Sequence, residues 1–177
     1  MRTLIFDTET TALIGNSLLA DRHQPQIIEF FGQIVNEEAE VVEELEFFCN
    51  PGKPLPDEVI RITGIKDEQV RSERPFDHYA GQVALLVQSA ETVVAHNLSY
   101  DMAVVEAEFK RLGLAINWPD DRICTVEQTE HLKGHRLSLS ALHEELFGEP
   151  FAGAHRARAD VDALTRCYLE LVRRGEI

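Results

Sequence analysis

The chain has 177 residues, of which 44% are hydrophobic and 27% are charged. This fits one domain, expected to span residues 1–177, and excludes a mainly disordered chain. Its 17 basic and 31 acidic residues give a net charge of −14, which excludes a protein that coats nucleic acid through a broad basic surface. No apolar run or secretory signal indicates a membrane, and three scattered cysteines indicate neither disulfides nor zinc. We therefore expect a cytoplasmic protein.

The first part of the chain is expected to form three strands. The apolar run Leu4-Ile5-Phe6 predicts a short strand that is buried on both faces and ends at Asp7. Ile27–Val35 and Val41–Phe48 are rich in Ile, Val and Phe, and the polar residues between them predict an antiparallel hairpin. Three glutamates on the second of these strands predict a sheet edge guarded by charge: Glu43, Glu44 and Glu46. The connection over residues 13–26 is long.

The rest of the chain alternates helices and strands. Helices are expected around residues 57–62, 67–73, 76–89, 98–112, 125–132, 138–147 and 157–173, and strands at Thr92–Ala95 and 122–124. Strands followed by strand–helix alternation predict an α/β domain with a mixed sheet.

Acidic residues stand at the ends of these elements, where apolar residues would be expected. Asp7 and Glu9 lie two apart on a strand, so both project from one face. Asp101 heads an apolar helical stripe that continues through Val105, Phe109 and Leu112, and Asp160 heads another through Leu164, Cys167 and Leu171. Taken singly, each acid also fits an ordinary polar turn or a helix's first turn. Together they predict four carboxylates that face inward.

Two further residues belong to these segments. His155 precedes the helix of Asp160, where the helix dipole favours a neutral ring that can accept a proton. Asn97 is placed to cap the helix of Asp101, and its neighbour His96 is expected to be structural. Ligands that are all oxygen suit Mg²⁺ or Mn²⁺ rather than Zn²⁺. The pattern therefore favours two-metal phosphodiester chemistry.

Three segments resemble, in order, the motifs of the DEDDh exonucleases, the family of the proofreading subunit of the bacterial replicative polymerase. They are Phe6-Asp7-Thr8-Glu9-Thr10-Thr11, His96-Asn97-Leu98-Ser99-Tyr100-Asp101 and His155-Arg156-Ala157-Arg158-Ala159-Asp160. Ile62-Thr63-Gly64-Ile65 is similar to the family's segment beside the terminal nucleotide, and Arg122-Ile123-Cys124-Thr125 to a segment of exodeoxyribonuclease X-like members. The resemblance implies a ribonuclease H-like fold, a five-stranded mixed sheet flanked by helices.

The resemblance also implies 3′→5′ hydrolysis that releases nucleoside 5′-monophosphates with the help of two Mg²⁺ or Mn²⁺ ions. Asp7 would bridge both ions, while Glu9 and Asp160 would hold the ion that carries the attacking water. Asp101 would serve the second ion, and His155 would be the general base. The residues expected to contact substrate are Thr10, Thr11, Ala12, Thr63, Gly64, Ile65, Asn97 and Tyr100.

The substrate is expected to be a single-stranded or frayed 3′ end, with DNA favoured over RNA on the pairs Thr10-Thr11 and Cys124-Thr125. A polymerase or repair complex is a candidate partner, although the chain ends 17 residues after Asp160, so no polymerase-tethering tail is expected. Ala12 departs from the family's usual glycine. Two alternatives stay open: an exoribonuclease that trims RNA, and a catalytically idle RNase H-like module that only binds.

Overall fold

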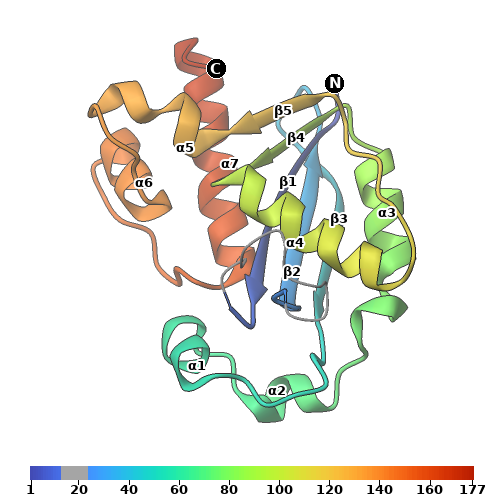
Figure 1. Ribbon diagram of the computed structural model, residues 1–177. Coiled ribbons are helices and arrows are strands. Elements are labelled where there is room, and N and C mark those ends of the chain that lie inside the picture. Colours follow the sequence, from blue (N-terminus) through green and yellow to red (C-terminus); the bar gives the residue numbers. More distant parts are fainter. Residues whose placement is uncertain (13–23) are drawn as a thin grey trace.

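The computed structural model describes residues 1–12 and 24–177, so most of the long connection over residues 13–26 lies outside the described residues (Figure 1). Within them, one mixed sheet has the strand order β3-β2-β1-β4-β5. The strands are β1 (Thr3–Thr10), β2 (Ile27–Val35), β3 (Val41–Phe48), β4 (Thr92–Ala95) and β5 (Asp121–Cys124). β1 pairs antiparallel with β2 and parallel with β4, which confirms the predicted mixed sheet and its hairpin.

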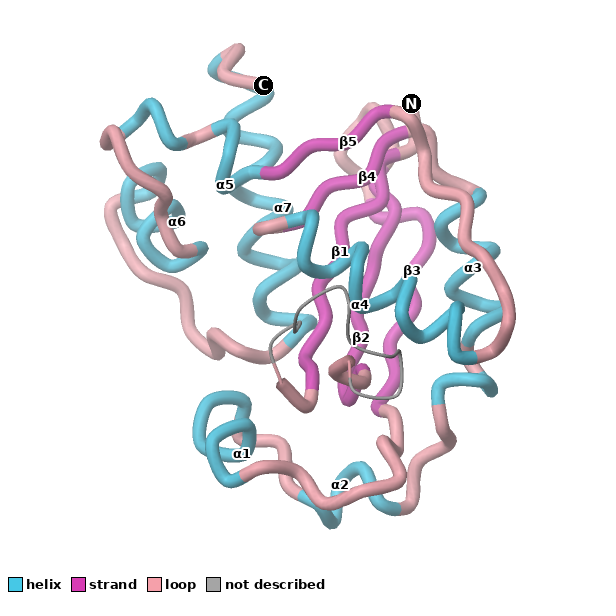
Figure 2. Tube along the Cα trace, in the orientation of Figure 1, coloured by secondary structure: helices cyan, strands magenta, loops and turns pink. Residues whose placement is uncertain are grey.

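Helices cover both faces of this sheet, and two short ones lie beyond the end toward which β1 points (Figures 1 and 2). The helices are α1 (Asp57–Thr63), α2 (Asp67–Arg71), α3 (Ala80–Gln88), α4 (Leu98–Arg111), α5 (Thr125–Gln128), α6 (Leu139–Phe147) and α7 (Ala157–Arg174), with 3₁₀ turns at Phe76–His78 and Glu130–Leu132. In the described part of the chain, no helix combines the length and apolarity needed to cross a bilayer.

Alternation along β1 divides the core between the two faces. Leu4 and Phe6 pack in the cluster that includes residues of α3 and α4, whereas Ile5 packs with residues of α7. Because side chains two apart on a strand share a face, Asp7 and Glu9 continue the face of Ile5 toward α7. The alternation of side chains along β1 therefore places these two acids on the face that α7 covers.

Three details differ from the sequence-based expectations. β1 does not end at Asp7 but continues to Thr10, since Asp7–Thr10 pair with β2. The helix expected over residues 76–89 begins only at Ala80, after a 3₁₀ turn. Leu112 does not complete the buried stripe of Asp101, because it lies beyond the last turn of α4 and is 39% exposed.

Candidate active site

The end of β1 joins the start of α4 through the second motif. The Asp101 carboxylate, buried in the first turn of α4, accepts hydrogen bonds from the Thr8 backbone N–H (3.1 Å) and from Thr8 Oγ1 (2.7 Å). Thr8 points to the face opposite Asp7 and Glu9. These bonds fix Asp101 beside the strand that carries the two other acids.

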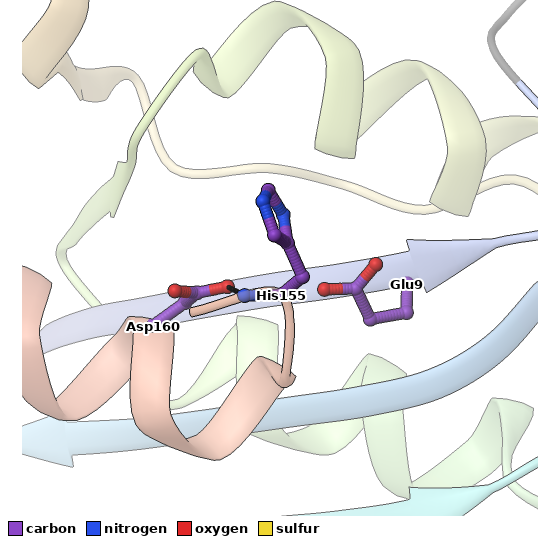
Figure 3. Close-up of side chains that lie close together, drawn as sticks. All are labelled: Glu9, His155 and Asp160. Atoms are coloured by element: carbon purple, nitrogen blue, oxygen red, sulfur yellow. Dashed lines mark hydrogen bonds between the residues drawn. The ribbon is translucent and has the colours of Figure 1, made fainter. Parts of the chain in front are cut away.

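The third motif approaches the same strand from α7. Single ligand atoms of Glu9, His155 and Asp160 all lie within 4.8 Å of one another (Figure 3). The His155 backbone N–H donates to Asp160 Oδ2 at 2.9 Å, so the loop before α7 is tied to the helix's first turns. Residues more than 140 positions apart in the sequence thus form one cluster.

The four acids of the three motifs hold their protons more tightly than free carboxyl groups. Burial, together with the nearby charges of Asp160 and Glu29, raises the pKa of Glu9 to about 8. Burial raises the pKa of Asp101 to about 7, against the opposing effect of its bonds from Thr8. Burial also raises the pKa of Asp160 to about 6. The pKa of Asp7 is raised by burial and by the charge of Asp101.

This donor set fits a hard divalent cation. Carboxylate oxygens are the ligands that Mg²⁺ and Mn²⁺ prefer, and Glu9 and Asp160 offer oxygens close enough to share an ion. The raised pKa values of Glu9 and Asp7 arise partly from mutual repulsion, which a bound cation would relieve. Asp7 and Asp101 lie outside the cluster of three but interact electrostatically with it.

Backbone strain marks two of the motifs. Among residues 1–12 and 24–177, the non-glycine residues with positive φ are Ala39, Asn97 (φ 77°) and His155 (φ 68°). Asn97 and His155 each stand at the entrance of a helix that carries a site acid. Such conformations cost free energy and concentrate at functional sites.

A pocket of about 650 Å³ opens beside Glu9, between the end of β1, α1 and the start of α4. Most of the predicted substrate contacts line it: Thr10, Thr11, Ala12, Thr63, Asn97 and Tyr100. Tyr100 OH donates to the Ala12 carbonyl oxygen (2.9 Å) and is hydrogen-bonded to Thr10 Oγ1 (2.6 Å), which ties α4 to this wall. Gly64 and Ile65 do not line the pocket, and Ile65 is fully buried in the core.

Three further features concern residues in or beside the motifs: Asn97, His96 and an ion pair of Arg156. Asn97 occupies the N-cap position of α4, but its side chain makes no capping hydrogen bond. His96 is structural, as expected: its ring is bonded to Thr125 Oγ1 (2.9 Å) and to the Leu137 carbonyl oxygen (3.1 Å), and burial lowers its pKa to about 4. Sequence reasoning missed the ion pair between Glu29 and Arg156. The signal available in the sequence was Glu29 itself, a charged residue within a strand of mostly apolar residues.

Comparison with known families and proteins agrees with this geometry. The family model RNase_T, described as Exonuclease, matches residues 4–168. DNA polymerase III subunit epsilon of Pasteurella multocida is 30% identical over 176 residues, which cover 96% of this chain and 68% of the relative. The 3′-5′ exonuclease DinG of Bacillus subtilis is also 30% identical. The match covers 97% of this chain but only 18% of the length of DinG.

Solved structures confirm the predicted ribonuclease H-like fold. The nuclease domain of 3′hExo, a DEDDh family member bound to rAMP, has a TM-score of 0.76 at 18% identity and covers 98% of this chain and 92% of its own. E. coli Exonuclease I in complex with a dT13 oligonucleotide has a TM-score of 0.76 at 19% identity, and the match covers 97% of this chain and 41% of Exonuclease I. Exonuclease X in complex with 5′ overhanging duplex DNA has a TM-score of 0.67 at 22% identity, and the match covers 98% of this chain and 93% of Exonuclease X.

Proposed function

The chain belongs to the RNase_T exonuclease family and is a 3′→5′ exonuclease of the DEDDh type, and from this premise we propose that it hydrolyses single-stranded or frayed DNA 3′ ends. The observation that carries the proposal is the convergence of Glu9, His155 and Asp160, of which Glu9 also lines a nucleotide-sized pocket. The product of each cycle would be one nucleoside 5′-monophosphate.

The four acids are proposed to hold two Mg²⁺ or Mn²⁺ ions. Asp7 would be shared by both, Glu9 and Asp160 would hold one, and Asp101 would serve the other. When bound, the ions would supply charge stabilisation to the scissile phosphate and to the leaving oxygen. The donor chemistry of the cluster supports this assignment.

His155 is proposed as the general base, accepting the proton of the attacking water at a ring nitrogen. The water oxygen bonds to phosphorus as the bond to the 3′ oxygen of the preceding nucleotide breaks, and that oxygen then takes up a proton. The exposed position of His155, next to Glu9 and Asp160, supports this role because its ring can meet both solvent and substrate.

The pocket is proposed to receive the terminal nucleotide. Thr10, Thr11 and Ala12 would contact its sugar and phosphate, and the apolar side chains of Val59 and Ile62 on α1 would contact its base. Ile62 is 41% exposed although it is apolar, which supports a contact with a ring that stacks on it.

DNA is favoured because the relatives include DNA polymerase III subunit epsilon, and RNA is the second candidate because 3′hExo was solved with rAMP. A polymerase or repair complex in the cytoplasm is the proposed setting. A module that only binds is disfavoured, because all four acids and His155 are present.

The decisive test compares 5′-labelled DNA and RNA of one sequence, with Mg²⁺ or Mn²⁺, for the wild type and Asp7→Ala. We expect a descending ladder on DNA that is absent in EDTA and in the variant. A ladder on RNA alone would keep the chemistry and reverse the substrate. Metal binding without cleavage of either the DNA or the RNA would favour a module that only binds.

A further inference from the structure

Glu29 is a buried acid with a built set of partners. It lies on β2, directly opposite Glu9 in the β1–β2 register, and is 1% exposed. The Arg156 side chain reaches it with two nitrogens: Nε lies 3.1 Å from Oε2 and Nη2 lies 3.0 Å from Oε1. The Ala157 backbone N–H also donates to Oε2, at 3.2 Å. One carboxylate therefore binds both the side chain and the backbone where α7 begins.

Helix α7 depends on this carboxylate for its cap. Arg156 is the N-cap residue and makes no capping hydrogen bond with its own side chain. The first N–H groups of a helix have no partner within the helix, and a negative group there also interacts favourably with the helix dipole. Glu29 supplies both a hydrogen-bond acceptor for the Ala157 N–H and a negative charge at this end of α7. It does so from β2, more than 120 positions earlier in the chain.

The contacts of Glu29 lie directly after the strained residue of the site. His155, with φ 68°, immediately precedes Arg156, and its own N–H is held by Asp160. Arg156 also lies over the Phe48 ring, with its guanidinium carbon 5.4 Å from the ring centre. The backbone on the C-terminal side of His155 is thus fixed to the sheet that carries Glu9.

We propose that Glu29 and Arg156 are positioning residues, which hold His155 and Asp160 at the distance from Glu9 that catalysis requires. The inference rests on the proposed function for its kinetic consequence, but its structural consequence can be measured without any substrate. Residues that orient a catalytic or metal-binding group typically change activity by about 10- to 100-fold when they are replaced.

Arg158 provides a matched control on the same helix. It pairs with the exposed Glu46 (2.7 Å) and lies over the Phe31 ring at 4.1 Å, but it contacts neither Glu29 nor His155. Arg156→Gln and Arg158→Gln remove the same charge two residues apart. Because Arg156→Gln leaves a buried charge unpaired and can unfold the chain, the double variant Glu29→Gln/Arg156→Gln removes both charges and keeps two amides in their place.

The first measurement is hydrogen exchange in a peptide that spans residues 153–161, at a temperature where each variant is folded by circular dichroism. We expect faster exchange in Arg156→Gln and in the double variant, and wild-type exchange in Arg158→Gln. Equal exchange in all four proteins would overturn the inference. This result does not depend on whether the wild type cleaves nucleic acid.

The second measurement is kcat and KM on a short DNA oligonucleotide at saturating Mg²⁺. We expect the double variant to lose about tenfold or more in kcat while KM changes by less than about twofold, with Arg158→Gln at the wild-type kcat. If the double variant has the wild-type kcat, catalysis does not need this ion pair and the inference fails. A wild type that cleaves nothing would instead refute the proposed function, and the exchange data would still decide the positioning.

Discussion

Asp160 and Asp162 stand two positions apart on α7, yet their surroundings differ. Asp160 meets Glu9 and His155, whereas Asp162 faces solvent, as the helical spacing predicts. We expect Asp160→Asn to lower kcat by more than about a hundredfold, which exceeds the usual cost of losing an outer partner. Asp162→Asn, the control, should keep kcat within about twofold. A similar loss in both variants, measured on labelled oligonucleotide, would contradict the assignment.

The raised pKa values of the acids predict how the metal-free protein responds to pH. Glu9 and Asp101 have ordinary pKa values near 4 but about 8 and about 7 in the fold. Between these limits the native state binds more protons than the unfolded state, so a rise in pH lowers the free energy of unfolding. His96, whose pKa falls to about 4, acts in the opposite direction, but only below its ordinary value of 6.5.

The pH range from 6.5 to 8 therefore lies above the opposing effect of His96. In EDTA, we expect the urea midpoint of the wild type to fall across this range. Mg²⁺ should weaken or reverse the trend, because the ions bind the ionised carboxylates. A midpoint that rises with pH in EDTA would show that burial and neighbouring charges do not raise the pKa values of these acids in the fold.

Sequence patterns locate the four acids and His155 because each stands at the end of an element whose type the pattern also predicts. The partner of a buried charge is not predictable in the same way. Glu29 and Arg156 lie 127 positions apart and meet only through the packing of α7 on β2. Asn97 is a residue type that suits the N-cap of a helix. Its backbone, however, has a positive φ, and its exposed side chain makes no capping hydrogen bond.

Among the elements, α7 carries Asp160, follows directly on His155 and contributes much of the core. Leu164 lies one turn beyond Asp160 and is 1% exposed, so Leu164→Ala should lower the free energy of unfolding by about 2–5 kcal/mol. Val172, on the same helix but 46% exposed, gives the control, and Val172→Ala should change it by less than about 0.5 kcal/mol. Equal losses in urea unfolding would mean that α7 does not pack as described.

Element types followed from periodicity, but two boundaries did not. β1 continues through Asp7 and Glu9 because pairing with β2 holds the backbone, whatever the polarity of the side chains. The segment at residues 76–89 keeps helical spacing across the 3₁₀ turn, since 3₁₀ and α-helical periods differ little over a single turn. Hydrogen bonding decided both boundaries, and side-chain patterns do not report it.

On the scale of the whole molecule, the net charge of −14 limits how many phosphates the protein can attract. We expect the logarithm of the affinity for a single-stranded oligonucleotide to fall with the logarithm of salt concentration with a slope of about −2 or shallower, as two or three neutralised phosphates would give. Fluorescence anisotropy with Asp160→Asn at constant Mg²⁺ measures binding without cleavage. A slope steeper than about −4 would reveal a basic track along the substrate.

The proposed active site gathers its side chains from β1, α4, the loop before α7 and α7 itself. During synthesis, a chain that has emerged as far as α6 already exposes Asp7, Glu9 and Asp101 but lacks His155 and Asp160. On the proposed roles of these groups, such a chain lacks the general base and one metal ligand, so it would not cleave nucleic acid near the ribosome. On the proposed function, hydrolytic competence is thus acquired only when α7 docks on the sheet, so the part of a nascent chain that precedes α7 would be harmless to nucleic acid.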